Sequence, residues 1–269
     1  MDDHHGFRDA YALETVRPDD IVLVGDSFVW GEGVAKHQRF GDRLEQLYEK
    51  EGRRVRVFSL GVRGAGPPLY IESLARVPVG VRAGVVIVAF YPNDIDPRPR
   101  ARWLRWIFDT SWALGRSSLT CRSVHDLLPK VETPSVAAYH RSLVEDYRAA
   151  DPTFPRRWAD LAGSLDRFKH LADRRAPSRP LLLVIPLMVD YRSYPLTPVH
   201  DALAVAAEGL GYDVLDLLPD FRQSLVDGDR YRLKRNDNHF NASVHEFVSV
   251  LIKRCLDARP DTAGLGRVR

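Results

Sequence analysis

The chain contains 269 residues, of which 45% are hydrophobic and 28% are charged. These values are ordinary for a soluble globular protein, and the length suits one large α/β domain or two small domains. The 39 basic and 36 acidic residues leave a net charge of only +3. This balance gives no electrostatic reason to expect a nucleic-acid partner.

Neither the apolar runs nor the cysteines indicate a special environment. Residues 1–7 lack the basic and apolar regions of a signal peptide. No apolar run approaches the roughly 20 residues needed to span a bilayer. We therefore expect a cytoplasmic protein, although loss of an N-terminal anchor would leave the same pattern. Cys121 and Cys255 fit neither a metal-ligand spacing nor a disulfide framework, and we interpret them as buried thiols.

Short apolar runs alternate with amphipathic stretches along most of the chain. Strands are predicted at 21–24, 55–58, 85–90, 181–185 and 214–215, and helices at about 40–48, 199–209 and 242–256. Continuous apolar strands separated by helices are typical of a parallel sheet that is covered on both faces. The sequence therefore predicts an α/β fold, a three-layer α/β/α sandwich with five strands.

The alternation stops between about 97 and 177, where helices and loops without a good strand are predicted. Four of the five tryptophans fall in this segment, namely Trp103, Trp106, Trp112 and Trp158. We interpret it as a helical insertion into a single domain spanning 1–269, with aromatic side chains that pack on the sheet. The alternatives are a lid over the site, or a contact with a membrane surface through the Arg- and Trp-rich residues 98–112.

The first candidate site follows the first predicted strand, at Gly25-Asp26-Ser27. The glycine permits a tight turn, and the serine arrives at the carboxyl edge, where open parallel sheets bind ligands. The serine N–H then points into the same crevice as its hydroxyl group. Such a tripeptide is also common in ordinary strand-to-helix turns.

The second candidate is His239, which Asn236 and Asp237 precede just before the last predicted helix. A histidine beside an acid can act as a general base that the acid holds in one tautomer. The alternative interpretation is a polar loop with a helix N-cap at Asn241. The position of this loop, in a chain with a candidate nucleophile after its first strand, favours the catalytic interpretation.

Two more fragments follow the second and third predicted strands. The first, residues 60–66, is a glycine-rich turn that includes Gly61 and Gly64, and the second is Tyr91-Pro92-Asn93-Asp94. Acyl transfer develops negative charge on the carbonyl oxygen, and a single preorganised donor can contribute about 3–4 kcal/mol to its stabilisation. A glycine N–H and the Asn93 amide at the carboxyl edge could supply such donors.

These four stretches resemble, in order, the sequence blocks of the SGNH hydrolases, also called GDSL-type esterases. The resemblance covers roughly residues 20–96 and 178–256. It implies Ser27 as nucleophile, His239 as base, and an oxyanion hole of the Ser27 and Gly64 N–H groups with the Asn93 amide. Gly61 is the alternative backbone donor. The resemblance also implies a flavodoxin-like sheet and ester, thioester or carbohydrate-acyl chemistry.

Three positions depart from the family pattern. Pro92 stands where the third block usually has glycine. The family usually has its acid three residues before the histidine, where this chain has Asn236, whereas Asp237 comes two residues before. We expect Asp237 to orient His239, with Asn236 as the alternative. Val244 replaces the glycine that usually precedes a second histidine, here His245, and we expect this change to affect helix packing.

No cofactor or metal is expected. The chain has no phosphate loop or dinucleotide fingerprint. Asp94 and Asp96 could hold a divalent ion, but two acids that leave a strand are more typical of turns and caps. We therefore expect a metal-free esterase or deacylase with a Ser27–His239–Asp237 site, acting on an acyl ester of a small molecule, lipid or glycan.

Two other functions fit the same residues. An acyltransferase would pass the acyl group to a sugar or metabolite hydroxyl, since water and alcohols attack the same intermediate. A non-catalytic binding protein would keep a degenerate hydrolase fold without turnover.

Overall fold

A five-stranded sheet forms the centre of the molecule. The computed structural model describes residues 7–9, 11–95, 136–148, 151–235 and 237–266. The strands are β1 (Ile21–Gly25), β2 (Val57–Gly61), β3 (Val85–Phe90), β4 (Leu181–Val184) and β5 (Asp213–Asp216). Their order is β2-β1-β3-β4-β5, and every neighbouring pair is parallel. The predicted parallel α/β sheet is confirmed.

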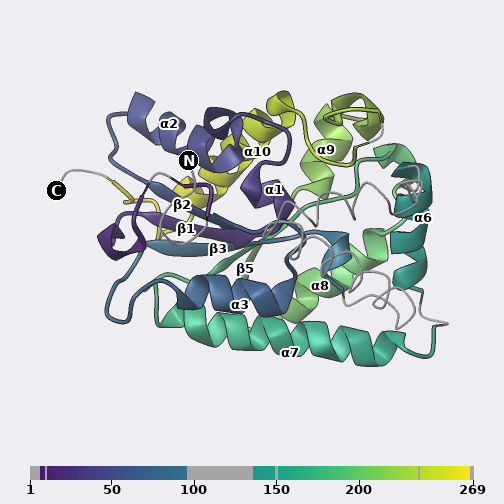
Figure 1. Cartoon of the computed structure of the whole chain (residues 1–269), viewed down its shortest axis with the longest axis horizontal. Helices are drawn as coiled ribbons and strands as arrows, with labels where there is room; N and C mark the ends of the chain where they lie inside the picture. The colour runs from purple at the N-terminus through teal and green to yellow at the C-terminus, as the bar shows by residue number, and fades with distance from the viewer. Residues whose placement is uncertain (1–6, 10, 96–135, 149–150, 236, 267–269) are drawn as a thin grey trace, which may run out of the picture.

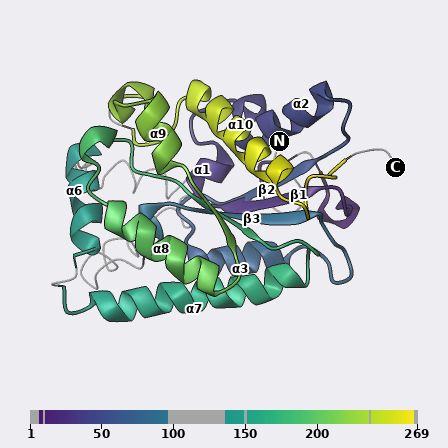
Figure 2. The ribbon, with the colours of Figure 1, turned by 180° about the vertical axis from the view of Figure 1, so that it is seen from behind.

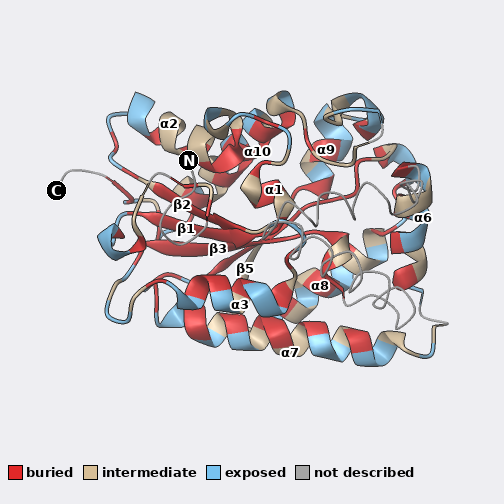
Figure 3. Cartoon of the chain, viewed as in Figure 1, coloured by how far each residue is buried: buried red, intermediate tan, exposed pale blue. Residues whose placement is uncertain are grey.

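Helices cover both faces of the sheet (Figures 1 and 2). One layer contains α2 (Phe40–Lys50), α9 (Leu218–Ser224) and α10 (Ala242–Ala258), and the other contains α3 (Pro67–Ala75), α7 (Phe154–Asp173) and α8 (Thr197–Gly209). Each helix turns buried residues toward the sheet and exposed residues outward (Figure 3). This arrangement is the predicted three-layer α/β/α sandwich.

The core lies on both sides of the three central strands. Every residue of β1, β3 and β4 is buried, as expected for strands covered on two faces. The residues of β5, at the edge of the sheet, are only partly buried. The second strand runs over 57–61 rather than 55–58, because Ser59 and Gly61 continue the ladder beside β1.

Of the segment between β3 and β4, the structure describes residues 91–95, 136–148 and 151–180. The segment contains α6 (Val136–Asp146) and α7, and α7 lies along α3 in the layer under the sheet (Figure 1). Trp158 on α7 is partly buried against the core. The other three tryptophans of the predicted insertion, together with residues 98–112, lie outside the described residues. An inserted lid over the site stays a prediction.

Two further sequence expectations can be compared with the described residues. No helix among them is both long and apolar enough to cross a membrane. Cys255 on α10 is a free, partly buried thiol, and Cys121 lies outside the described residues.

Candidate active site

The strand order creates a crevice at the carboxyl ends of β1 and β3. The chain passes from β1 to β2 on one side and then returns to β3 on the other side of β1. The loops that follow β1 and β3 therefore leave the sheet in opposite directions, and ligands of open α/β sheets bind at this point. Ser27 and Asn93 follow these two strands.

Ser27 comes after a sharp turn at the end of β1. A Cβ atom on Gly25 would lie 2.5 Å from the Cγ2 atom of Val29. Glycine therefore lets the one-turn helix α1 (Ser27–Trp30) fold back closely on the strand. As the first residue of α1, Ser27 has an N–H without a partner inside the helix.

Both ends of α1 are held by hydrogen bonds. The Oδ1 atom of Asp26 accepts the N–H of Phe28 at 2.9 Å, which is an N-cap. Gly31 ends the helix with a φ of 74°, in the left-handed region. From the N-terminal segment, the Arg8 guanidinium donates to the carbonyl oxygens of Gly31 at 2.9 Å and of Trp30 at 3.4 Å.

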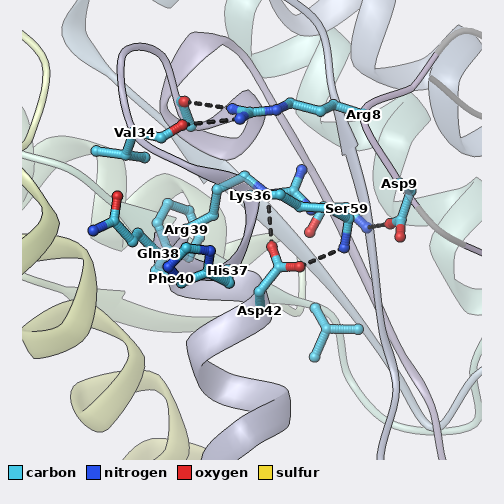
Figure 4. Close-up of polar contacts among 12 residues, drawn as sticks. Arg8, Asp9, Val34, Lys36, His37, Gln38, Arg39, Phe40, Asp42 and Ser59 are labelled. Carbon is cyan, nitrogen blue, oxygen red and sulfur yellow. Dashed lines mark hydrogen bonds and ion pairs between the residues drawn. The ribbon is translucent and has the colours of Figure 1, made fainter. Parts of the chain in front are cut away.

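A buried arginine supports the loop after α1. Arg39 is 1% exposed, and its Nε atom donates to the Oδ2 atom of Asp42 at 2.6 Å. Its stem packs on Gly31, where a Cβ atom would lie 2.2 Å from the Cγ atom of Arg39. Figure 4 shows this pair together with Arg8, which also donates to the carbonyl oxygen of Val34 at 2.9 Å. The sequence motifs contain no sign of these contacts.

His239 lies in a loop that is tied down on both sides. Arg232 and Phe240 form an antiparallel bridge, and the Leu233 N–H donates to the His239 carbonyl oxygen at 2.8 Å. Asn241 then caps α10, accepting the N–H groups of residues 243 and 244 on its side chain. The predicted N-cap and the candidate base therefore coexist, and the cap fixes where the loop enters the helix.

The structure brings Ser27, His239 and Asp237 into one hydrogen-bonded series. The His239 Nδ1 atom lies 2.7 Å from the Oδ1 atom of Asp237, and its Nε2 atom lies 2.7 Å from the Oγ atom of Ser27. A carboxylate can only accept, so the Nδ1 atom carries the proton and the Nε2 atom of the neutral ring accepts the serine hydroxyl. The His239 N–H also donates to the Oδ1 atom of Asp237, at 2.9 Å.

Aromatic rings surround the contact between Ser27 and His239. The Phe28 ring lies 4.4 Å from that of Tyr91, 5.0 Å from that of His239 and 4.8 Å from that of Phe240, centroid to centroid. The Asn238 amide donates to the Tyr91 hydroxyl at 3.3 Å. Burial raises the pKa of Tyr91 well above its ordinary value, so this phenol stays protonated. The loop of His239 is thereby joined to the end of β3.

The two candidate glycines after β2 have different surroundings. A Cβ atom on Gly61 would lie 2.2 Å from the backbone nitrogen of Trp30, so this glycine allows α1 to lie against β2. Gly64 has a φ of 68°, is exposed, and a Cβ atom there would meet nothing within 4 Å. Of the two, Gly64 has the surroundings of a residue that lines an open site.

Asn93 is the middle residue of the short 3-10 helix η3 (Pro92–Asp94), directly after β3. Pro92 is its first residue, a position that suits proline because the missing N–H would have no partner in the helix. The Asp94 carboxylate accepts the Tyr91 N–H at 3.0 Å and the Tyr70 hydroxyl at 2.7 Å. These hydrogen bonds fix the conformation of η3, the short helix that contains Asn93.

The other departures from the family pattern have local explanations. Asn236 lies outside the described residues, and Asp237 is the acid that contacts His239. Val244 is fully buried in the core. The buried His245 accepts the Phe40 N–H on its Nδ1 atom at 3.2 Å, and burial lowers its pKa to about 3. Val244 and His245 both serve the packing of α10 against the rest of the fold.

The two acids considered as metal ligands after β3 are Asp94 and Asp96. Asp94 is engaged by tyrosine and backbone donors, and Asp96 lies outside the described residues. Within the described part of the chain, no group of three His, Cys, Asp or Glu side chains could hold a metal ion.

Solved structures of G-D-S-L lipolytic proteins have this arrangement of strands and helices. A member of that family from Veillonella parvula DSM 2008 aligns over 89% of this chain and 99% of its own, with 12% identity and a TM-score of 0.54. The TesA structure aligns over 88% of this chain and 97% of its own, with 14% identity and a TM-score of 0.55. The chain has the SGNH-hydrolase fold.

The likeness concerns the fold, because the identities are so low. No protein-family model matches the chain, and no curated protein does. The resemblance predicted from four short motifs is nevertheless confirmed in three dimensions, since they meet at one edge of a sheet with the family's architecture. The chain therefore has the fold of esterases and lipases of this kind.

Proposed function

We propose that the chain is a serine esterase that hydrolyses an acyl ester without a metal ion. The observation that carries this proposal is the pair of 2.7 Å contacts from Ser27 to His239 and from His239 to Asp237. A hydroxyl, an imidazole and a carboxylate in this series are the components of nucleophilic acyl transfer. The substrate would be an acyl ester of a small molecule, lipid or glycan.

In the first half of the reaction, the Ser27 Oγ atom attacks the acyl carbonyl carbon while its proton moves to the Nε2 atom of His239. Asp237 stabilises the resulting imidazolium through the Nδ1 hydrogen bond. When the tetrahedral intermediate collapses, the carbon–oxygen bond to the alcohol breaks and His239 returns the proton to the departing oxygen. The acyl group remains on Ser27 as an ester.

In the second half, a water molecule replaces the alcohol. His239 takes a proton from the water as its oxygen attacks the acyl-enzyme, and then returns the proton to Ser27 as the carboxylic acid leaves. In both halves, negative charge develops on the carbonyl oxygen. The proposed donors to it are the N–H groups of Ser27 and Gly64 and the side-chain amide of Asn93.

The test is hydrolysis of p-nitrophenyl acetate and butyrate, with fluorophosphonate labelling as a second readout. The wild type should hydrolyse and label, and Ser27→Ala should do neither. Ser243→Ala is a matched control, because Ser243 is an exposed serine at the start of α10 that bonds to Asn241. Equal hydrolysis and labelling by wild type and Ser27→Ala would exclude Ser27 as the nucleophile.

The same assay separates hydrolysis from acyl transfer when acceptor alcohols are added. A change in product partitioning with an added sugar or polyol would indicate an acyltransferase. An absence of labelling, combined with tight binding of an intact ester, would indicate a binding protein.

A further inference from the structure

Helix α6 stands across the end of the sandwich at which the proposed site lies (Figures 1 and 2). Two electrostatic interactions agree with this position. Tyr139 of α6 adds to the raised pKa of Tyr91, and Asp94 adds to the raised pKa of Tyr147, the residue after α6. The helix therefore runs past the loop that carries Asn93.

One face of α6 is turned inward. Val136, His140, Leu143 and Tyr147 are all buried, and their spacing of four, three and four residues places them on a single helical stripe. Two of these four residues are polar at the tip. His140 and Tyr147 are 6% and 7% exposed, respectively.

Their polar tips have no hydrogen-bond partner among the described residues. The Nε2 atom of His140 and the hydroxyl of Tyr147 are both buried and unpaired. So is the Oδ1 atom of Asn93, on the η3 turn that faces the same end of the sheet. Buried polar atoms are nearly always paired, because leaving one unpaired is costly to folding. A ligand bound at this end of the sandwich could supply the missing partners of these three atoms.

Each of the three residues lies in, or within electrostatic reach of, a segment next to the proposed catalytic residues. Asn93 is itself a proposed oxyanion donor through its amide nitrogen. The Tyr147 ring lies close enough to Asp94, the next residue, to feel its charge. His140 lies near Arg232, which forms the backbone bridge with Phe240, the residue after the proposed base.

The chemistry of these atoms restricts what can satisfy them. An amide oxygen only accepts, so a carbonyl oxygen or an oxyanion cannot pair with the Oδ1 atom of Asn93. A tyrosine hydroxyl donates and accepts. Burial, with a further contribution from Arg232, lowers the pKa of His140 to about 4, so its imidazole is neutral near pH 7 and can also do either. Hydroxyl groups of a ligand suit all three atoms.

We propose that His140, Tyr147 and the Oδ1 atom of Asn93 bind hydroxyl groups on the alcohol part of the substrate, which is then an acyl ester of a sugar or another polyol. Simple acetyl and fatty acyl groups carry no O–H, which assigns these contacts to the alcohol. The inference rests on the proposed esterase function. It makes His140 and Tyr147 specificity-determining residues that lie outside the four family motifs.

The kinetic test compares esters that share an acyl group and differ only in hydroxyls. The pairs are 6-O-acetylglucose with cyclohexylmethyl acetate, and glycerol 1-acetate with propyl acetate. The wild type should have a higher kcat/KM for the hydroxylated member of each pair. Tyr147→Phe and His140→Phe should each lower that kcat/KM roughly tenfold and leave the plain ester unchanged.

Tyr48→Phe is the matched control. The Tyr48 hydroxyl is also buried without a hydrogen-bond partner in the described structure, but it lies on α2, where Arg53 and Lys253 stack on its ring, and not beside α6. Removing either hydroxyl should leave the melting temperature unchanged or raise it. Of these two tyrosine variants, only Tyr147→Phe should change the ratio of the kcat/KM values for the hydroxylated and the plain ester. Equal losses on both esters, or no loss on either, would overturn the proposal.

A binding measurement keeps this inference separate from the proposed function. In Ser27→Ala, the imidazole resonances of His140 should shift on addition of 6-O-acetylglucose and stay in place with cyclohexylmethyl acetate. If the resonances shift but the wild type hydrolyses neither ester, the polyol site stands and the esterase proposal fails. If the wild type hydrolyses both esters equally and the resonances do not move, the polyol site is wrong.

Discussion

The Nε2 atom of His239 lies 2.7 Å from the Oγ atom of Ser27, although 212 positions separate the two residues in the chain. The contact exists because Ser27 starts the helix after the central strand β1 and His239 lies just ahead of the last helix. A sheet with this strand order brings both segments to one edge. The distance is that of a formed hydrogen bond, which is the geometry that the proposed proton transfer requires.

Replacing Asp237 by asparagine should lower kcat by about 10⁴-fold. An asparagine can present its amide N–H to the Nδ1 atom of His239, which would shift the ring proton to the Nε2 atom and remove the base. The measurement is kcat for p-nitrophenyl acetate. Asn236→Ala is the control and should keep most of the activity. The reverse result, with Asp237→Asn active and Asn236→Ala inactive, would assign the orienting role to residue 236.

The two glycines after β2 should respond differently to alanine. Gly61→Ala should lower the free energy of unfolding by about 3 kcal/mol or more, because its Cβ atom would overlap the backbone of α1. Gly64→Ala should cost only about 1–2 kcal/mol, for a left-handed φ, but should lower kcat because the turn moves its N–H group. Urea unfolding and ester kinetics on both variants test this. A Gly64 variant with unchanged kcat would remove Gly64 from the oxyanion hole.

Asn93→Ala should reduce activity without reducing stability. Loss of one oxyanion donor typically lowers kcat by about 10²- to 10³-fold. The same substitution removes a buried oxygen without a partner in the described structure, so the free energy of unfolding should stay the same or increase. Kinetics and urea unfolding of one protein sample measure both effects. A variant that loses stability and activity in parallel would make Asn93 a structural residue.

Stability should fall as the pH drops below about 6.5, and His245 should contribute to this fall. Its pKa is lowered to about 3 in the folded protein, so at intermediate pH the unfolded chain binds a proton that the folded chain does not. The free energy of unfolding then decreases by up to about 1.4 kcal/mol per pH unit for this group. His245→Asn, whose amide oxygen can still accept the Phe40 N–H, should show a shallower decrease between pH 7 and pH 5. If urea unfolding gives the same dependence of the free energy of unfolding on pH for the wild type and His245→Asn, this account is wrong.

The central strands could be predicted from the sequence because their residues are continuously apolar. Burial on both faces requires such residues, and β1 and β3 lie where the apolar runs predict. The second strand was predicted two residues early at its start and ends later than predicted, at Gly61. Ser59 and Gly61 have low strand propensity, but the neighbouring strand and the close approach of α1 determine their conformation.

The proposed catalytic residues could be predicted because their motifs are local. His140 and Tyr147 could not, because a residue's lack of a partner depends on everything that packs around it. In the sequence, His140 on α6 and Tyr147 directly after it look like part of an ordinary buried helical stripe. The contacts of Arg8 and Arg39 could not be predicted from the sequence either. Arg8 donates to a backbone carbonyl 23 positions away, and the pair of Arg39 and Asp42 belongs to no recognised motif.

The support from Arg8 bears on how the boundaries of such proteins are chosen. Residues 7–9 precede the first strand and the first motif, yet Arg8 bonds to carbonyl oxygens at the end of α1 and Asp9 accepts the Ser59 N–H inside the sheet layer (Figure 4). A protein trimmed to begin at β1 would keep every proposed catalytic residue but would lose the hydrogen bonds from Arg8 that hold the end of α1, the helix that Ser27 begins. Expression of the domain and searches for related sequences should therefore include residues 7–9 ahead of the Gly-Asp-Ser motif.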